Sequence, residues 1–540
     1  MSAVTTPSRL RSLLDVPEIA DVHSPAWARR IPERALIGGV LVVLLACSAV
    51  IRTRTLSGEL WFQEASAIGL AMHPVGALLS DVKAAGASPL YYLLLHFWIQ
   101  AFGDGEAATH ALSLLIGLAT IPAAMWAGWS LGGRRAGLFA AILFAFGSFE
   151  TRYAEAAQPY ELTAALGLIA TAALIIAFVQ RRRWALWLLG AALTAMLYTQ
   201  GDAILYWIGA GVAIALLARM APAGTGERRA IARDAGLCFG AAAILYLPWL
   251  PATIGQIEHS TAVWHYTPLL GASIPRELLG SERVDVTLLT AVVVAVAPLL
   301  ASRARRAAGG TDARTYMLLF AIPAVGLLVA RIAGTWLPIW AWRYFAPLVA
   351  PLLLVGALAC ARARVVGVAA IVFCIAFLAN PSSFAPKHKS DMADVAAQMA
   401  PLMARGDMVL VSQPEQAPLT WYYLPRGLKF QTPLGRVADP SWMDWNGALA
   451  ALRRSNPASL RAVVASLRPG QQVLFVRPLT EGDRNWSTPW TQLVRRRSAQ
   501  WGQILVGDVA DGTLEQVARA PADYQSSCCI ASSAVLYRRR

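Results

Sequence analysis

The stretch ELTAALGLIATAALIIAFVQRRRWALWLLGAALTAMLYT, residues 161–199, decides the fold class of this chain. It consists of two apolar runs, 161–180 and 184–199, separated by three consecutive arginines, Arg181 to Arg183. An apolar helix of about 20 residues is long enough to cross the hydrocarbon core of a bilayer, which is about 30 Å thick. Arginines in a short loop between two such helices are typical of the cytoplasmic side. The stretch therefore predicts two membrane crossings joined by a cytoplasmic loop.

Similar apolar runs follow one another through the first 380 residues. They are approximately 35–51, 107–131, 136–150, 161–180, 184–199, 203–219, 235–252, 286–302, 315–333, 341–361 and 364–380. Each can cross the hydrocarbon core, the shorter ones with help from flanking residues. The sequence therefore predicts a polytopic α-helical membrane protein with about eleven transmembrane helices.

The composition supports a membrane protein and argues against a nucleic-acid binder. Of the 540 residues, 56% are hydrophobic and only 15% are charged, whereas about a quarter are charged in soluble domains. The 47 Lys and Arg exceed the 32 Asp and Glu, which gives a formal charge of +15. Much of this charge lies in short loops between apolar runs, where it indicates membrane topology, so we expect no nucleic acid partner.

One apolar run, PLYYLLLHFWIQAFG at 89–103, is ambiguous because it has only 15 residues. If it does not cross the membrane, the arginine-rich loops that follow all fall on the cytoplasmic side. We therefore predict a helix lying on the outer membrane surface, with its aromatic residues at headgroup level. A short true span is the alternative.

This topology divides the chain into three parts. They are a cytoplasmic N-terminal segment 1–34, a transmembrane domain 35–380 with outer-face loops 52–106 and 253–285, and an extracytoplasmic α/β domain 381–540. The last part is polar, with a helical periodicity at 393–405 and β-rich runs at 408–412, 473–476 and 534–537.

Two outer segments are candidates for covering a site. Loop 253–285 has the length of a mobile lid and carries Trp264, His265 and Tyr266. The C-terminal domain carries aromatic residues that stack on a substrate, pack the domain core or rest on the membrane; they are Trp421, Tyr422, Tyr423, Trp442 and Trp445.

Polar and aromatic residues also gather at the outer ends of several predicted spans. A site built from span ends would form a cavity bordered by lipid, which suits a membrane-embedded substrate. Taken singly, each aromatic residue is equally typical of an interfacial belt, and each arginine of a snorkelling anchor. The acids Glu64 and Glu155 are less easily explained, because a carboxylate beside a membrane needs a partner or a task.

Several of these segments form an ordered series. It consists of W-F-Q-E-A at 61–65, S-P-L-Y-Y-L-L-L-H at 88–96, F-G-D-G-E at 102–106, G-G-R-R-A-G at 132–137 and R-Y-A-E-A-A-Q-P-Y at 152–160. The series resembles the bacterial GT-C membrane glycosyltransferases related to protein O-mannosyltransferases and lipid A aminoarabinose transferases. The resemblance covers about residues 35–380.

The resemblance implies an activity and a location. Such enzymes take a sugar from a polyprenyl phosphate at the outer face of the bacterial plasma (inner) membrane. They pass it with inversion to an envelope glycan, lipid or protein. The resemblance also implies that a carboxylate of the D-E pair is the general base. Cationic groups, sometimes with a divalent metal, would hold the lipid phosphate.

Three positions depart from the family pattern, and each has become glutamine. Gln63 replaces the expected Asp, Gln158 replaces an Arg, and Gln200 replaces a His that could ligate a metal. We therefore predict Glu64 or Glu155 as the catalytic base and no residue as a metal ligand. The residues predicted to bind substrate are Gln63, Tyr91, Tyr92, Arg152, Tyr153, Gln158, Tyr160, Gln200, Asp202, Arg343 and Tyr344.

Two functions stay open at this point. The chain is either an active glycosyltransferase, or a catalytically silent relative that binds a polyprenyl lipid or scaffolds envelope assembly. A transporter fits less well, because transporters place ionisable residues near the bilayer midplane, whereas the acids here lie at span ends.

Overall fold

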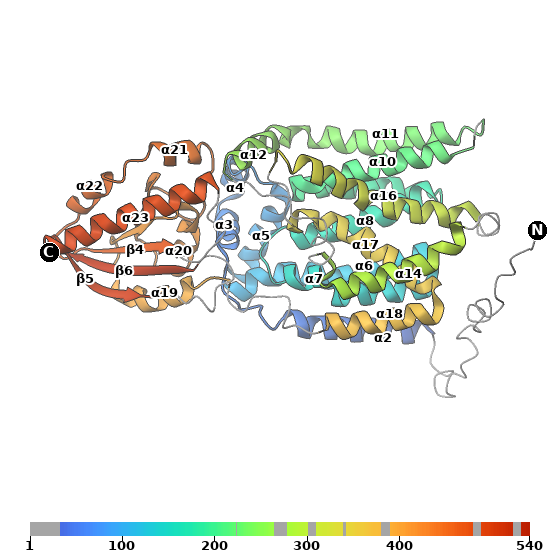
Figure 1. Ribbon diagram of the computed structural model, residues 1–540, viewed down its shortest axis with the longest axis horizontal. Helices are drawn as coiled ribbons and strands as arrows, with labels where there is room; N and C mark the ends of the chain where they lie inside the picture. The colour runs from blue at the N-terminus through green and yellow to red at the C-terminus, as the bar shows by residue number, and fades with distance from the viewer. Residues whose placement is uncertain are drawn as a thin grey trace, which may run out of the picture.

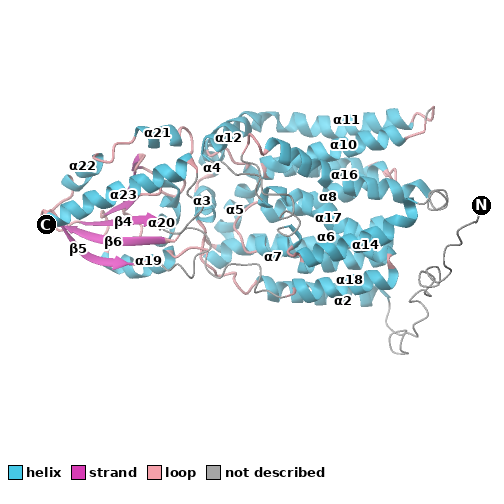
Figure 2. Ribbon diagram, viewed as in Figure 1, coloured by secondary structure: helices cyan, strands magenta, loops and turns pink. Residues whose placement is uncertain are grey.

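The computed structural model describes residues 33–222, 224–263, 278–300, 309–337, 342–379, 389–478, 488–521 and 531–540. It is an elongated molecule with three layers along its length (Figure 1). Long helices form one end, the short helices α3, α4 and α5 lie in the middle, and a domain with a β-sheet forms the other end. Figure 2 shows that the strands are confined to this last domain.

Long, roughly parallel helices coincide with all the predicted apolar runs. They are α2 (Glu33–Arg52), α6 (Glu106–Phe146), α8 (Tyr160–Phe178), α9 (Trp184–Thr199), α10 (Ile204–Met220), α11 (Glu227–Tyr246), α14 (Glu282–Leu300), α16 (Gly309–Ala333), α17 (Ala346–Arg362) and α18 (Arg364–Leu378). Among the described residues, seven segments are long and apolar enough to cross a membrane, and α9 and α18 are shorter apolar helices. The polytopic membrane class is therefore confirmed.

Helix α6 contains two of the predicted spans, which a kink at two glycines separates. Its backbone leaves the helical conformation at Gly132 and Gly133, and Gly133 has φ = 80°. Glycine adopts this left-handed conformation without the steric cost that a Cβ atom would bring. The halves then pack closely, since a Cβ on Gly128 would lie 2.5 Å from the carbonyl oxygen of Ala136.

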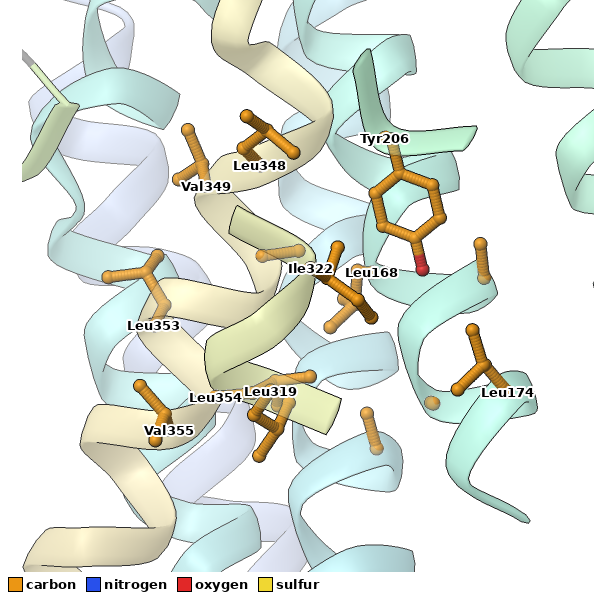
Figure 3. Close-up of a cluster of buried hydrophobic side chains, with 14 of the residues drawn as sticks. Leu168, Leu174, Tyr206, Leu319, Ile322, Leu348, Val349, Leu353, Leu354 and Val355 are labelled. Atoms are coloured by element: carbon orange, nitrogen blue, oxygen red, sulfur yellow. The ribbon is translucent and has the colours of Figure 1, made fainter. Parts of the chain in front are cut away.

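The long helices pack around α17, whose candidate span is 83% buried. Figure 3 shows Leu348, Val349 and Leu353 of α17 beside residues of α8, α10 and α16. Peripheral helices instead present apolar side chains outward, such as Val43 of α2, 60% exposed, and Leu237 of α11, 64% exposed. A helix bundle whose outer surface is apolar as well as its core requires lipid around it.

The C-terminal domain contains a six-stranded mixed sheet with the order β3-β2-β1-β4-β6-β5. The strands are β1 (Met408–Val411), β2 (Lys429–Thr432), β3 (Gly435–Val437), β4 (Gln472–Pro478), β5 (Leu514–Ala520) and β6 (Ser532–Arg539). The helices are α19 (Met392–Met399), α20 (Ala417–Tyr423), α21 (Ala448–Arg454), α22 (Ser459–Ala465) and α23 (Pro489–Ala510). Strand β1 pairs in parallel with β2 and β4, while the other pairs are antiparallel. The three β-rich runs predicted from the sequence coincide with β1, β4 and β6.

Alternate side chains of the central strands pack in two different cores. Leu410 and Phe475 pack with Trp501 of α23 on one face of the sheet. Val409 and Leu474 belong to a second core, which continues into the middle layer of the molecule. This second core includes residues of α3 (Phe62–Met72) and α5 (Pro89–Phe102). The C-terminal domain is therefore joined to the membrane domain through a shared hydrophobic core.

Helix α5 is the ambiguous apolar run of the sequence. It lies with α3 and α4 (Val75–Ala84) at the end of the long helices, against the C-terminal domain (Figure 1). That this helix lies on the membrane surface without crossing it stays a prediction.

Two neighbouring tyrosines fix the C-terminal domain to the chain between α2 and the start of α6. The hydroxyl of Tyr423 accepts a hydrogen bond from the N–H of Leu60, 2.8 Å away, and donates one to the carboxylate of Glu106. The Tyr422 hydroxyl donates to the carbonyl oxygen of Asp104 at 2.8 Å. Both hydroxyl groups therefore act in docking. Trp264, His265 and Tyr266 of the predicted lid lie outside the described residues.

Candidate functional site

A cavity of about 240 Å³ lies where the long helices, the middle layer and the C-terminal domain meet. The membrane domain contributes its lining from α3, from the chain before α8 and from the chain after α9. Glu415, Pro418, Met443 and Trp445 contribute from the C-terminal domain. The cavity therefore lies at the sheet-domain end of the apolar helices, with walls from both domains.

The three glutamines that depart from the family pattern all line this cavity, together with Gln256 of α12 (Leu250–Val263). Gln158 Nε2 donates to the main-chain oxygen of Gln63 at 2.9 Å. Gln200 Nε2 donates to the carboxylate of Asp202 at 3.1 Å. An amide both donates and accepts hydrogen bonds without carrying charge, so four amides in one cavity suit the hydroxyl groups of a sugar.

Two carboxylates line the cavity in the described part of the chain. Asp202 follows α9 in a short 3-10 helix, Gly201–Ala203. Glu415 lies on another, Pro414–Gln416, in the C-terminal domain. Its Oε1 accepts hydrogen bonds from Gln413 Nε2 and Trp490 Nε1, each at 3.0 Å, and burial raises the pKa of this carboxyl above its usual range. Sequence reasoning missed Glu415, because no pattern connects the C-terminal domain to the span ends.

No Lys, Arg or His lines the cavity among the residues that the structure describes. Arg343 lies next to the lining, and its Nη2 donates to the hydroxyl of Tyr344 at 3.5 Å. Its guanidinium lies over the rings of Tyr344 and Trp61, at 5.0 and 5.8 Å from their centroids. Since Tyr344 itself lines the cavity, Arg343 lies one side chain behind the wall.

The structure brings most of the predicted substrate-binding residues together. Those that line the cavity are Gln63, Tyr92, Gln158, Tyr160, Gln200, Asp202 and Tyr344. Four others lie behind it. Tyr91 is fully buried, with its hydroxyl 2.9 Å from Ser113 Oγ. The rings of Tyr153 and Tyr160 pack with their centroids 4.8 Å apart. The guanidinium of Arg152 lies 5.8 Å from the ring centroid of Trp342, and that of Arg343 lies over the ring of Tyr344.

Glu64 does not line the cavity, although its neighbour Gln63 does. The Glu64 side chain is 2% exposed, and its Oε1 accepts hydrogen bonds from Lys389 Nζ at 2.8 Å and from the N–H of Ala157 at 3.1 Å. His110 Nε2 lies 3.3 Å from the same oxygen. Burial alone would raise the pKa of Glu64, but the charges of Lys389 and His110 outweigh it and lower the pKa to about 2. These contacts tie the chain between α2 and α6, the chain before α8 and the start of the C-terminal domain together.

Glu155 belongs to the same cluster and also lies outside the cavity lining. Its carboxylate accepts a hydrogen bond from the hydroxyl of Thr55, and its main-chain oxygen accepts one from Lys389 Nζ at 2.5 Å. Burial raises the pKa of Glu155. A general base has to lie within hydrogen-bond reach of the acceptor, so the positions of Glu64 and Glu155 suit a supporting role better than the predicted catalytic one.

Helix geometry explains why adjacent residues separate in this way. Gln63 and Glu64 stand in the first turn of α3, where successive side chains point about 100° apart. Glu64 Oε2 accepts a hydrogen bond from the N–H of Trp61 at 2.7 Å, which caps the helix. The capping contact and the ion pair with Lys389 fix Glu64 on the side away from the cavity.

The donor set of the cavity does not fit a zinc site. Its lining holds two carboxylates and neither His nor Cys, and Gln200 stands where the resemblance implies a His. Across the described residues, His, Cys, Asp and Glu form no group of three or more that could hold a metal ion. We therefore assign no step of the chemistry to a metal.

No protein-family model matches the sequence, and the comparison with curated proteins gives no match. Solved structures do match. ArnT from Cupriavidus metallidurans in the apo state aligns with a TM-score of 0.60 and 14% identity, over 93% of this chain and 98% of that chain. The same protein bound to undecaprenyl phosphate aligns with a TM-score of 0.55 and 14% identity, over 92% and 98%.

A more distant match is the archaeal oligosaccharyltransferase AglB from Archaeoglobus fulgidus, in complex with an inhibitory peptide and a dolichol-phosphate. It aligns with a TM-score of 0.50 and 12% identity, over 81% of this chain and 69% of that chain. Both proteins are glycosyltransferases of the GT-C fold. The sequence resemblance implied a GT-C fold, and the likeness to these structures confirms it for this chain. It also confirms the C-terminal domain that contains a sheet.

Proposed function

We propose that this chain is a membrane glycosyltransferase, which transfers a sugar from a polyprenyl-phosphate donor to an acceptor at the extracytoplasmic face. The observation that carries the proposal is the cavity. It lies at one end of an apolar helix bundle and is lined by neutral amides, tyrosines and two carboxylates. A donor with an apolar chain and a polar sugar needs lipid on one side and hydrogen-bonding groups on the other. The GT-C fold supports the same activity, since ArnT has been solved bound to undecaprenyl phosphate.

In this proposal the parts of the donor occupy different surroundings. The polyprenyl chain remains in the lipid beside the helices, and the sugar hydroxyls bind the amides of Gln63, Gln158 and Gln200. The phosphate lies toward Arg343, whose guanidinium stabilises the negative charge that grows on the leaving group. Glu64 and Glu155 hold the surrounding loops in place through Lys389.

The proposal includes a location and partners. We place the protein in the bacterial plasma (inner) membrane, with its N-terminus in the cytoplasm and residues 381–540 on the outer side. This orientation keeps the arginines of the loops, such as Arg181 and Arg182, on the cytoplasmic side. The acceptor is then a component of the cell envelope, namely a glycan, a lipid or a protein.

Turnover of defined donors tests the proposal. The full chain in lipid nanodiscs is supplied with radiolabelled undecaprenyl-phosphate sugars and an envelope extract as acceptor. We expect wild type to transfer label from at least one donor, and Gln200→Leu to lower kcat/KM about 10- to 100-fold, because it leaves polar groups of the sugar unpaired. Gln398→Leu is the matched control, since Gln398 is exposed on α19. Absence of transfer from every donor would refute the proposal.

A second candidate is a silent relative that binds a polyprenyl lipid without turning it over. Gln63 favours it, because an amide cannot accept a proton where the resemblance implies Asp. Native mass spectrometry separates the two: a silent protein would retain undecaprenyl-phosphate sugar unchanged over hours, whereas an enzyme would release undecaprenyl phosphate once the acceptor is added.

A further inference from the structure

The C-terminal domain contributes a carboxylate to the cavity that the family resemblance does not include. Glu415 lies outside residues 35–380, which carry the resemblance, yet it lines the same cavity as Gln63. Gln63 is the position where the resemblance implies an acid. One wall of the cavity has therefore lost a carboxylate, and a different domain supplies one.

Glu415 is held firmly by its neighbours. Two donors, Trp490 Nε1 and Gln413 Nε2, bind its Oε1. Trp490 is itself fully buried, and its ring packs against Trp445, another residue of the lining, with a centroid distance of 5.2 Å. A carboxylate fixed at one oxygen keeps its other oxygen in a defined position, which is what proton transfer from a bound acceptor hydroxyl requires.

The second oxygen of Glu415, Oε2, makes no contact with a hydrogen-bond donor in the described part of the chain. Glu415 is 3% exposed, its Oε2 has no hydrogen-bond partner, and it forms no ion pair with any described residue. Burying an unpaired carboxylate oxygen lowers the stability of the folded protein. If position 415 served only for packing, an uncharged side chain there would therefore be more favourable. A buried acid of this kind in a cavity is a mark of a functional group.

Asp202, the other carboxylate of the lining, is less suited to accept a proton. Its Oδ2 accepts a hydrogen bond from Gln200 Nε2 at 3.1 Å. That oxygen is therefore already engaged, whereas Oε2 of Glu415 has no hydrogen-bond partner among the described residues.

We propose that Glu415 is the general base of the transfer reaction, an inference that rests on the proposed function. Its carboxylate takes the proton of the acceptor hydroxyl as the acceptor oxygen forms a bond to the anomeric carbon. The bond from that carbon to the phosphate oxygen breaks, and its electron pair leaves with the polyprenyl phosphate. The proton passes from Glu415 to water after the products depart. The C-terminal domain is then part of the catalytic machinery.

Isosteric replacement tests the assignment. We expect Glu415→Gln to lower kcat by about 10²–10⁴-fold, the range typical of a general base, with KM for the donor little changed. Glu515→Gln, on β5 of the same domain and partly exposed, is the matched control and should keep wild-type turnover. Glu415→Gln removes a buried charge without changing side-chain shape, so we expect a melting temperature at or above that of wild type.

Two further variants report on the chemistry itself. Gln63→Asp restores the acid that the resemblance implies, so adding it to Glu415→Gln should recover at least tenfold in kcat. Trp490→Phe removes a hydrogen bond that stabilises the Glu415 carboxylate, so the acidic limb of the kcat–pH profile should move to higher pH. A merely structural Glu415 would produce neither the rescue nor the shift.

The outcomes separate this inference from the proposed function. If wild type transfers sugar and Glu415→Gln does so at the same rate, the base assignment is overturned while the function stands. If wild type transfers sugar from no donor, both are overturned. Transfer by wild type, loss in Glu415→Gln and recovery with Gln63→Asp would support the inference.

Discussion

Replacing Glu64 should destabilise the protein far more than it impairs chemistry. The Glu64 side chain is 2% exposed and bound by Lys389 and His110, at 2.8 and 3.3 Å from its Oε1. Its carboxylate also caps α3 and accepts the N–H of Ala157. The informative variants are Glu64→Gln, Lys389→Met and the pair combined.

The magnitude follows from the lowered pKa of Glu64. Lowering a pKa from 4.5 to about 2 corresponds to about 3 kcal/mol of stability for the ionised form. Lys389→Met would leave the buried carboxylate without its lysine partner, and breaking a buried pair costs about 3–5 kcal/mol. The side chain of Lys389 is 16% exposed, so we expect a loss near the lower end, about 3 kcal/mol. The double variant should lose less than the sum of the single losses, because both remove one shared interaction.

The pH dependence has a definite sign. The folded-state pKa of Glu64 lies below the unfolded value, so its contribution is fully present above about pH 4.5 and is lost as the pH falls toward 2. Glu64→Gln should flatten this part of the stability profile.

The assay combines equilibrium unfolding in mixed micelles with sugar transfer measured below the unfolding transition. The expected result is a loss of about 3 kcal/mol for Glu64→Gln, with kcat of the folded fraction within about threefold of wild type. Turnover reduced more than 100-fold at unchanged stability would refute this reasoning, because Glu64 would then act directly in the chemistry.

Three further predictions concern other parts of the molecule. Arg343→Gln should raise KM for the lipid-phosphate donor about tenfold or more in transfer assays, because it removes a cation that contacts Tyr344 of the cavity lining. Arg152→Gln, beside the ring of Trp342, should have a smaller effect. Gly133→Ala should lower stability by about 1–3 kcal/mol in thermal unfolding because of its positive φ, whereas Gly190→Ala, in an open helical position, should not lower it. Tyr423→Phe should cost about 1–3 kcal/mol in denaturant unfolding, since it leaves the N–H of Leu60 and the carboxylate of Glu106 without the hydroxyl; an unchanged midpoint would show that docking does not depend on it.

The sequence predicted the architecture because the signals for it are local. An apolar run such as 161–180 has the length and hydropathy of a span whatever it packs against, and it coincides with α8. The β-rich run 473–476 likewise coincides with β4. Ordered motifs along the first 160 residues were enough to indicate the GT-C fold that ArnT shares.

The site was predictable only in part. The sequence identified the three glutamines and several tyrosines that line the cavity, because they occupy motif positions at span ends. It ranked Glu64 above Gln63 by chemistry alone, since an acid can serve as a base and an amide cannot. It gave no reason to consider Lys389 or Glu415, which lie far along the chain in a domain without a recognised motif.

The sequence by itself thus determined the membrane class, the helical runs, the sheet domain and the set of polar residues at the span ends. Only the tertiary structure decided that Gln63 lines the cavity while Glu64 pairs with a lysine 325 residues away. It alone placed Glu415 in the same cavity. The reason is physical: the direction of a side chain in a helix turns by about 100° per residue, and which direction meets a cavity depends on how distant segments pack. Hydropathy and motif order determine where the helices and the polar segments lie along the chain. Neither determines which side chains of those segments face the cavity.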